Sequence, residues 1–161
     1  MVSLRWHVKS FARLTKRELY NILAFRYEVF ALEQRVECLE IDGMDAIALH
    51  VYGVDKDGKV LAYARIIPPK TIYHGKKISF AKVGRVACSK KIRGQGLGKE
   101  LMKRTIRAIH GKWKQASIGI SAQAYLKKFY EDLGFKIKGR PYTEANIPHI
   151  KMELRQTEKT V

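Results

Sequence analysis

A glycine-rich turn between a β-rich segment and an amphipathic helical pattern constrains this chain more than any other feature. The turn reads Arg93-Gly94-Gln95-Gly96-Leu97-Gly98 and directly follows a predicted strand at residues 83–88. Glycines let the backbone approach a ligand closely, and the first amides of a helix are unpaired and carry partial positive charge. We therefore expect this turn to bind a phosphate or pyrophosphate group.

The spacing within the turn excludes two better-known phosphate-binding motifs. The Walker motif would need glycine at position 93 and Ser or Thr at position 100, where Arg93 and Glu100 stand. The dinucleotide fingerprint, begun at Gly94, would need Gly or Ala at position 99, which is Lys99. The pattern that fits is Arg-x-x-Gly-x-Gly.

Hydrophobic periodicity and turn signals predict a mixed α/β layer fold. Thr15-Lys16-Arg17-Glu18 is a capping box that predicts a helix to about Gln34. An Asp-Gly turn between residues 48–54 and 60–67 predicts a β-hairpin. We expect further strands at residues 6–10, 78–89, 117–122, 135–139 and 149–155, and further helices at residues 96–110 and 124–133.

Length and composition favour one domain. The chain has 161 residues, of which 46% are hydrophobic, and no linker or repeat divides it. We expect a single domain at residues 1–155 and a polar tail at 156–161. The sequence shows no signal-peptide core and no apolar run long enough to span a bilayer, so we expect a cytoplasmic protein with no membrane partner. Cys38 and Cys88 lack metal-ligand spacing, which predicts reduced thiols and no metal.

Charge is unevenly distributed along the chain. The formal net charge of +17 suggests an anionic partner. Residues 28–45 hold six acids and one base, whereas residues 76–138 hold seventeen bases and three acids. The first segment suits a cation and the second an anion, unless both are solvated faces. A nucleic-acid-binding module is the less favoured alternative, since no zinc-finger, basic-zipper or RRM pattern accompanies the charge.

Two motifs together resemble the GCN5-related N-acetyltransferases (GNAT). After Arg-x-x-Gly-x-Gly comes Phe129-Tyr130-Glu131-Asp132-Leu133-Gly134-Phe135, which is similar to the second motif of that family. The resemblance implies the α/β GNAT fold, with a mixed, mostly antiparallel sheet of about six to seven strands, flanking helices and splayed central parallel strands. A closer resemblance to the ElaA-like subfamily is carried by Glu33-Gln34, Glu40-Ile41-Asp42-Gly43-Met44-Asp45, His50, Arg65, Gly84-Arg85-Val86, Ala122-Gln123-Ala124 and Ile147-Pro148-His149-Ile150.

The resemblance also implies a reaction. An acetyl group of acetyl-CoA would move to a primary amine by direct attack in a ternary complex. Backbone groups of Val86, Ala87 and Cys88 would contact the pantetheine arm and the thioester. The pyrophosphate would be bound by Arg93, Gly94, Gln95, Gly96, Leu97, Gly98 and Lys99. Tyr130 matches the tyrosine that protonates the departing thiolate, although an aromatic packed in the core is the alternative.

On the acceptor side, the sequence does not single out one general base or one set of substrate-binding residues. An ammonium must lose a proton before it attacks, and the central strand has no acid, so Glu33, Glu40, Asp42, Asp45, Glu144, His50 and His149 are the candidate bases. The histidines have the better matched pKa. Arg26, Arg65 and Arg85 form either an ion-pair network with these acids or, together with Glu33, Asp42, Asp45 and Gln123, a substrate-binding site.

The expected partner is an amine, as a small molecule or a peptide, and the expected assembly is a monomer or a homodimer. The acidic segment at residues 28–45 favours such a cationic acceptor. Residues 26–45 also resemble the acyl-homoserine lactone synthases, which gives an alternative acyltransferase function.

Overall fold

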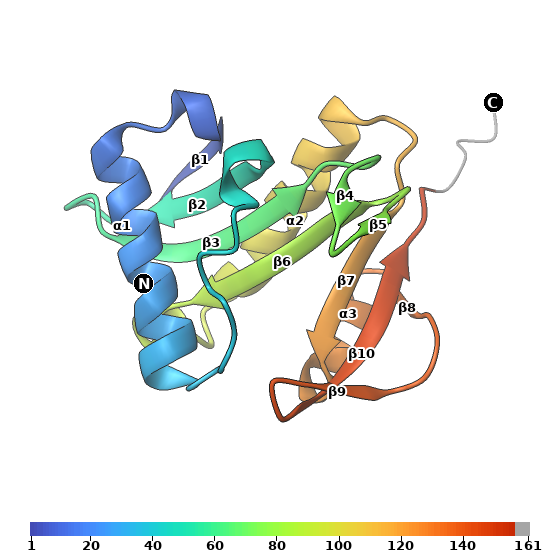
Figure 1. Ribbon diagram of the computed structural model, residues 1–161. Helices are drawn as coiled ribbons and strands as arrows, with labels where there is room; N and C mark the ends of the chain where they lie inside the picture. Colours follow the sequence, from blue (N-terminus) through green and yellow to red (C-terminus); the bar gives the residue numbers. More distant parts are fainter. Residues whose placement is uncertain (157–161) are drawn as a thin grey trace.

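The computed structural model describes residues 1–156 and has the mixed α/β architecture of the GNAT fold, as predicted (Figure 1). Its main sheet has the strand order β1-β2-β3-β6-β7-β10-β8, and β9 pairs with β10. The polar tail expected at 156–161 lies outside the described residues apart from Gln156. The strands are β1 (Arg5–Ser10), β2 (Leu49–Val54), β3 (Val60–Ile67), β6 (Ala81–Cys88), β7 (Ile118–Gln123), β8 (Lys136–Ile137), β9 (Tyr142–Glu144) and β10 (Ile147–Leu154), with β4 (Ile72–Tyr73) and β5 (Lys76–Lys77) in a small separate sheet.

The main sheet has eight strands, against the six to seven expected. The strand that the sequence did not indicate is β9, which forms a hairpin with β10 through Ala145 and Asn146. Both residues have positive φ, 48° and 60°, as the tightest hairpin turns require. Alanine rarely adopts that conformation, so this turn carries no clear sequence signal.

Three α-helices flank the sheet, and 3-10 turns join them to it. They are α1 (Lys16–Arg26), α2 (Leu97–Lys112) and α3 (Lys127–Glu131), with η1 (Phe11–Arg13), the π-helical η2 (Tyr27–Glu33), η3 (Asp45–Ile47), η4 (Lys90–Ile92) and η5 (Ala124–Leu126). The capping box is confirmed, because Thr15 and Glu18 exchange side-chain and backbone hydrogen bonds. The helix expected to reach Gln34 is α-helical only to Arg26 and continues as a π-helix.

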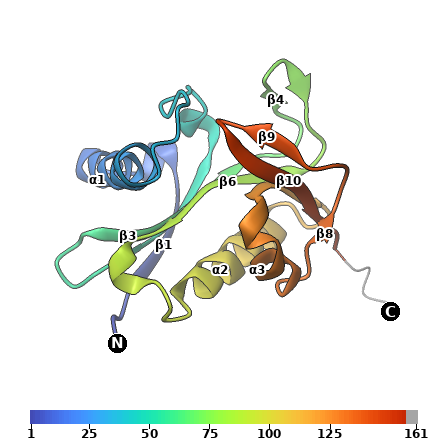
Figure 2. The ribbon, with the colours of Figure 1, turned by 90° about the horizontal axis from the view of Figure 1, so that it is seen from below.

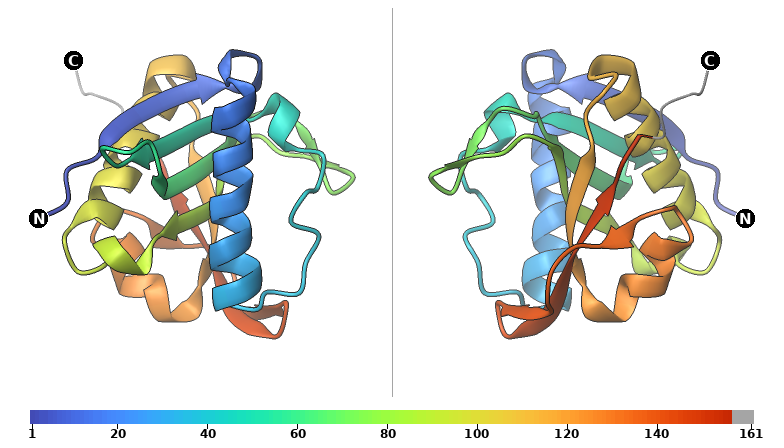
Figure 3. Two further views of the ribbon diagram at one scale, coloured as in Figure 1. Left: turned by 90° about the vertical axis from the view of Figure 1, so that its left-hand side faces the viewer. Right: turned by 90° about the vertical axis from the view of Figure 1, so that its right-hand side faces the viewer.

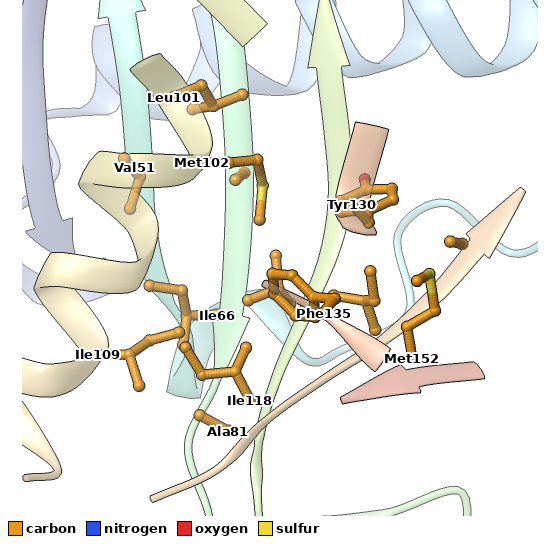
Figure 4. Packing of buried hydrophobic residues seen from close by; sticks show 14 of the residues in the cluster. Val51, Ile66, Ala81, Leu101, Met102, Ile109, Ile118, Tyr130, Phe135 and Met152 are labelled. Carbon is orange, nitrogen blue, oxygen red and sulfur yellow. The ribbon is translucent and has the colours of Figure 1, made fainter. Parts of the chain in front are cut away.

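The sheet is covered on both faces, so the protein has two hydrophobic cores (Figure 2). On one face α2 and α3 pack Leu101, Met102 and Tyr130 against the sheet and against Phe135 (Figure 4). On the other face α1 and η2 pack a smaller cluster of Ile22, Phe25, Val29, Tyr52 and Tyr63. Because side chains alternate along a strand, the residues of β3, β6, β7 and β10 are divided between these two faces.

The central parallel strands β6 and β7 diverge. They pair only where Ala81–Val83 lie opposite Ile118–Ile120, and Figure 1 shows them separating beyond that point. The expected splay is thus confirmed, and among residues 1–156 the edge of β6 beyond Val83 that faces β7 has no ladder partner. On its other edge β6 carries a bulge, since Arg65 pairs with Gly84 and Tyr63 with Ala87. Arg85, inside the bulge, has a φ of 53°.

Three further observations concern residues 1–156. The longest helix, α2, has 16 residues, and no helix in this part of the chain combines the length and apolarity needed to cross a membrane. Neither cysteine is in a disulfide; Cys38 is exposed and Cys88 is partly buried. In the same range no group of three or more His, Cys, Asp or Glu side chains is arranged to hold a metal ion.

Candidate active site

The predicted phosphate-binding turn has the geometry of an anion site. Gly94 and Gly96 have φ of 75° and 77°, a conformation that other residues rarely adopt. Gly96 is the N-cap of α2 and its carbonyl accepts the amide of Glu100 at 3.1 Å. The amides of Leu97, Gly98 and Lys99 find no acceptor among the described residues. Unpaired amides at the positive end of a 16-residue helix suit a phosphate.

Arg93 connects this turn to the opposite face of the sheet. Its guanidinium donates to the Cys88 carbonyl at 3.1 and 2.9 Å and forms an ion pair with Glu33, at the end of η2, at 2.6 Å. Gln95 is also engaged: its amide donates to the Lys91 carbonyl at 3.0 Å, and its carbonyl oxygen accepts the amide of Val2 at 3.2 Å. Both side chains therefore hold the turn in shape.

Tyr130 lies where α3, β6 and the start of α2 converge. The side chain is 5% exposed, and its ring packs edge-on against Phe129 and Phe135. Figure 4 shows the hydroxyl oxygen directed away from Phe135, and this hydroxyl makes no hydrogen bond to another described residue. Burial raises the pKa of Tyr130, so the phenol is protonated at neutral pH and able to donate.

Cys88 and Gly98 lie beside Phe129, the ring that packs against Tyr130. A Cβ built on Gly98 would lie 3.6 Å from the Cys88 sulfur and 3.9 Å from the Phe129 ring. Burial raises the pKa of the Cys88 thiol to about 11, so it is not a thiolate at neutral pH. A protonated thiol is a weak nucleophile, so the side chain of Cys88 is not suited to carry an acyl group. The structure thus brings together the residues predicted for the acyl-donor side.

The predicted acids and arginines form one buried group, which we call the arginine–carboxylate cluster. Its members are Arg26, Arg65, Arg85, Glu40, Asp42 and Asp45. Arg26 binds Glu40 at 2.5 Å and Asp45 at 2.6 Å. Arg65 forks onto both oxygens of Asp42, at 2.8 and 2.7 Å.

The cluster satisfies its own charges. Three guanidinium groups face three carboxylates, and Arg26 and Arg65 are 0% and 2% exposed. Burial alone would raise the pKa of Asp42, but hydrogen bonds and charge from Arg65, with Arg85, lower it to about 2. The cluster therefore has the geometry of the ion-pair network, and these acids are not free to bind a cation. Glu33 is likewise paired, with Arg93.

The two candidate histidines differ in what their nitrogens meet. His50 is 0% exposed, with Nε2 donating to the Asp45 carbonyl at 3.0 Å and Nδ1 accepting from the Tyr63 hydroxyl at 2.7 Å. Burial lowers its pKa, which keeps it neutral. His149, on β10, donates from Nδ1 to the Ile147 carbonyl at 2.7 Å, so a neutral ring has its lone pair on Nε2. Of the two, His149 alone has a nitrogen free to accept a proton.

Gln123, at the end of β7, meets the end of η2. Its side-chain amide donates to the side-chain oxygen Oε1 of Gln34 at 3.4 Å, and His149 is its partner across the β7–β10 ladder. Figure 3 shows the helical segment of α1 and η2 running along one face of the sheet. Gln123 and His149 therefore lie at the end of β7, beyond the residues where β6 pairs with it.

Sequence reasoning did not single out Lys82 and Tyr73, where β6 and β7 are still paired, or Lys151 on the neighbouring strand β10. The Lys82 ammonium lies 5.2 Å from the ring centre of Tyr73, and Lys151 is 5.7 Å from the ring centre of Tyr142. Strand alternation at residues 81–83 was the available signal for Lys82, because it places the lysine opposite the core positions Ala81 and Val83. Tyr73 and Lys151 carried no such signal.

With the fold and these contacts in hand, comparison with known proteins establishes the class. Residues 24–156 match the acetyltransferase (GNAT) domain family. This chain belongs to that family.

Within the family its similarity is to the ElaA and UPF0039 proteins. Protein ElaA of Escherichia coli is 32% identical over 151 residues, which are 92% of this chain and 95% of ElaA. A UPF0039 protein of Synechocystis is 36% identical over 154 residues, 96% of this chain and 97% of that protein. The crystal structure of an acyl-CoA N-acyltransferase from Pseudomonas aeruginosa superposes with a TM-score of 0.85 at 39% identity, covering 94% of this chain and 99% of that one.

The acyl-homoserine lactone synthases share the fold. The synthase LasI superposes with a TM-score of 0.78 over 96% of this chain and 91% of its own, at 17% identity. At that identity the likeness concerns the fold alone.

Proposed function

We propose that this protein is an acetyl-CoA-dependent N-acetyltransferase that acts on a primary amine of a small molecule or a peptide. One observation carries the proposal: the free amides of Leu97, Gly98 and Lys99 lie at the same end of the splayed strands as the unpaired edge of β6 beyond Val83. Coenzyme A has a matching shape, with a pyrophosphate followed by a chain that contains amides.

On this proposal the donor is held mainly by backbone groups. The turn from Arg93 to Lys99 binds the pyrophosphate, and the edge of β6 at Val86, Ala87 and Cys88 orients the arm and polarises the thioester carbonyl. When bound, acetyl-CoA supplies the acetyl group as an activated thioester. Holding donor and acceptor together provides much of the rate enhancement, because a bimolecular reaction becomes a unimolecular step within the ternary complex.

Two side chains move protons. Nε2 of His149 takes the proton from the acceptor's ammonium, which frees the lone pair that attacks the thioester carbon. As the carbon–sulfur bond breaks, the Tyr130 hydroxyl donates its proton to the departing sulfur, and the second proton that the attacking nitrogen loses in becoming an amide returns through solvent to the tyrosinate. His50, whose two nitrogens are both hydrogen-bonded inside the protein, positions Asp45 and Tyr63.

Calorimetric titration with acetyl-CoA tests the donor site, using Gly98→Asp as the variant. The added carboxylate repels a phosphate, so we expect binding weaker by on the order of 100-fold. Because the new side chain lies near the Cys88 sulfur and the Phe129 ring, the thermal midpoint is measured alongside to show that the variant is folded. Gly111→Asp is the matched control, because it adds the same charge near the other end of α2, where a Cβ meets nothing within 4 Å. Equal affinities of Gly98→Asp and the wild type would refute the site.

A further inference from the structure

Two lysines share the face of the sheet that carries the arginine–carboxylate cluster. Ala81 and Val83 of β6 point into the core under α2, so Lys82 points to the opposite, α1 side. Ile150 and Met152 of β10 place Lys151 on that side by the same alternation. Lys151 pairs with Ser121 of β7, and Lys82 pairs with Gly119 of β7, two residues earlier.

The surroundings of these lysines are aromatic and contain one acid. Lys82 lies over Tyr73 and Lys151 over Tyr142. Glu144 accepts hydrogen bonds from Ser121 at 3.2 Å and from Tyr142 at 3.4 Å. Among residues 1–156 neither lysine has a carboxylate oxygen within the 4.0 Å of an ion pair. We call these residues, Tyr73, Lys82, Ser121, Tyr142, Glu144 and Lys151, the lysine cluster.

Charge in this region is out of balance. The arginine–carboxylate cluster has equal numbers of cations and anions, which leaves Lys82 and Lys151 facing Glu144 alone. Burial, the largest cause, lowers the pKa of Lys82, as do the positive charges of Lys151, Arg65 and Arg85, while the negative charge of Glu144 partly offsets them. The two lysines thus share one nearby carboxylate, and a bound anion would relieve the remaining cost of the partly buried Lys82 cation.

Resting on the proposed function, we propose that the amine acceptor also carries an anionic group, a carboxylate or a phosphate, which Lys82 and Lys151 bind. Lys82 stands three residues before Arg85, roughly 10 Å along the strand, and Val86 follows at the proposed thioester position. An acceptor that places its amine there and its anionic group at Lys82 has several bonds between the two. Simple diamines and polyamines have no anionic group, so they would not make the contact with Lys82 and Lys151.

Matched acceptor pairs test the inference. Free CoA is measured with acetyl-CoA and L-lysine or cadaverine, which differ only in the carboxylate, and with aminobutyl phosphate or aminobutanol, which differ in the phosphate. We expect at least one of the two anionic amines to exceed the amine of its pair that lacks the anionic group by about tenfold or more in kcat/KM. A preference in the first pair identifies a carboxylate, and in the second a phosphate.

Variants connect that preference to the lysines. Lys82→Met keeps the apolar stem and should abolish the preference while leaving the rate with cadaverine or aminobutanol unchanged, and Lys82→Arg should restore part of it. Lys103→Met, on the exposed side of α2, is the matched loss of charge and should change nothing. Equal use of both members of each pair, or a preference that survives Lys82→Met, overturns the inference.

The donor measurement separates the two proposals. If acetyl-CoA binds and every anionic amine is inert, the inference is wrong and the donor site stands. If acetyl-CoA does not bind, the proposed function itself has failed.

Discussion

Tyr130 has a buried ring and a hydroxyl without a hydrogen-bond partner among the described residues. Tyr130→Phe keeps the packing against Phe129 and Phe135 and removes only the donor. We expect kcat to fall about 10²-fold, with the acetyl-CoA affinity and thermal midpoint nearly unchanged. Steady-state kinetics and calorimetry measure both. Tyr125→Phe, on a side chain that is 74% exposed, is the control; an unaltered kcat for Tyr130→Phe would exclude the acid role.

For individual residues, the sequence was most informative where a recognised motif assigned a residue its place in the fold. The turn from Arg93 to Gly98 was predicted from its glycines, and the structure gives Gly94 and Gly96 the positive φ that glycine allows. The contacts of His50 could not be foreseen, since its partners, the Tyr63 hydroxyl and the Asp45 carbonyl, are brought to it by the fold. Lys82 could have been placed by strand alternation, but its aromatic neighbour Tyr73 is likewise brought to it by the fold.

The segment after α1 is an element whose length was predicted and whose geometry was not. α-Helical spacing over the whole predicted segment would place Arg26 and Glu33 on one face. In η2 the amide of Gln34 instead bonds to the Val29 carbonyl, five residues back, which widens the turn. Arg26 consequently faces the arginine–carboxylate cluster, whereas Glu33 reaches Arg93. Local propensity does not distinguish these two hydrogen-bond patterns.

The arginine–carboxylate cluster ties the segment between η2 and β2 to the sheet, and its loss should be costly. Arg65→Met removes both hydrogen bonds to Asp42 and leaves buried carboxylates uncompensated, so we expect a loss of about 3 kcal/mol or more in the free energy of unfolding. Urea denaturation measures it. Lys128→Met, which breaks the exposed pair with Asp132, should cost less than about 0.5 kcal/mol. Comparable costs for the two variants would contradict a buried network.

The pH dependence of stability is a property of the whole molecule to which Asp42 contributes a defined part. The pKa of Asp42 is about 2 in the folded protein, whereas its ordinary value is 3.8. Between these two pH values this carboxylate binds a proton in the unfolded state but not in the folded state. The stabilisation is therefore complete above pH 4 and is lost as pH falls toward 2, by about 2 kcal/mol. Urea midpoints between pH 7 and 2.5 should fall less steeply for Asp42→Asn. If the urea midpoints of Asp42→Asn and of the wild type fall equally steeply with pH, the carboxylate of Asp42 is not paired with Arg65 in this way.

The net charge of +17 has a more specific meaning once the molecule is assembled. The acidic segment at residues 28–45 favoured a cationic acceptor. In the structure, however, its Glu33, Glu40, Asp42 and Asp45 form ion pairs with arginines of the protein itself. The sequence indicates the density of charge but not its pairing, because the partners are far apart along the chain. On the two proposals, an anion would be recognised at two sites on the molecule, the start of α2 and the lysine cluster.

Direct detection of both products tests the central claim. Purified protein is incubated with acetyl-CoA and the panel of amines, and mass spectrometry quantifies free CoA and acetylated amine together. We expect the two to appear in a one-to-one ratio with at least one amine, and both to disappear in Gly98→Asp. Release of CoA without any acetylated amine, or equal activity in Gly98→Asp, would contradict an N-acetyltransferase that uses this site.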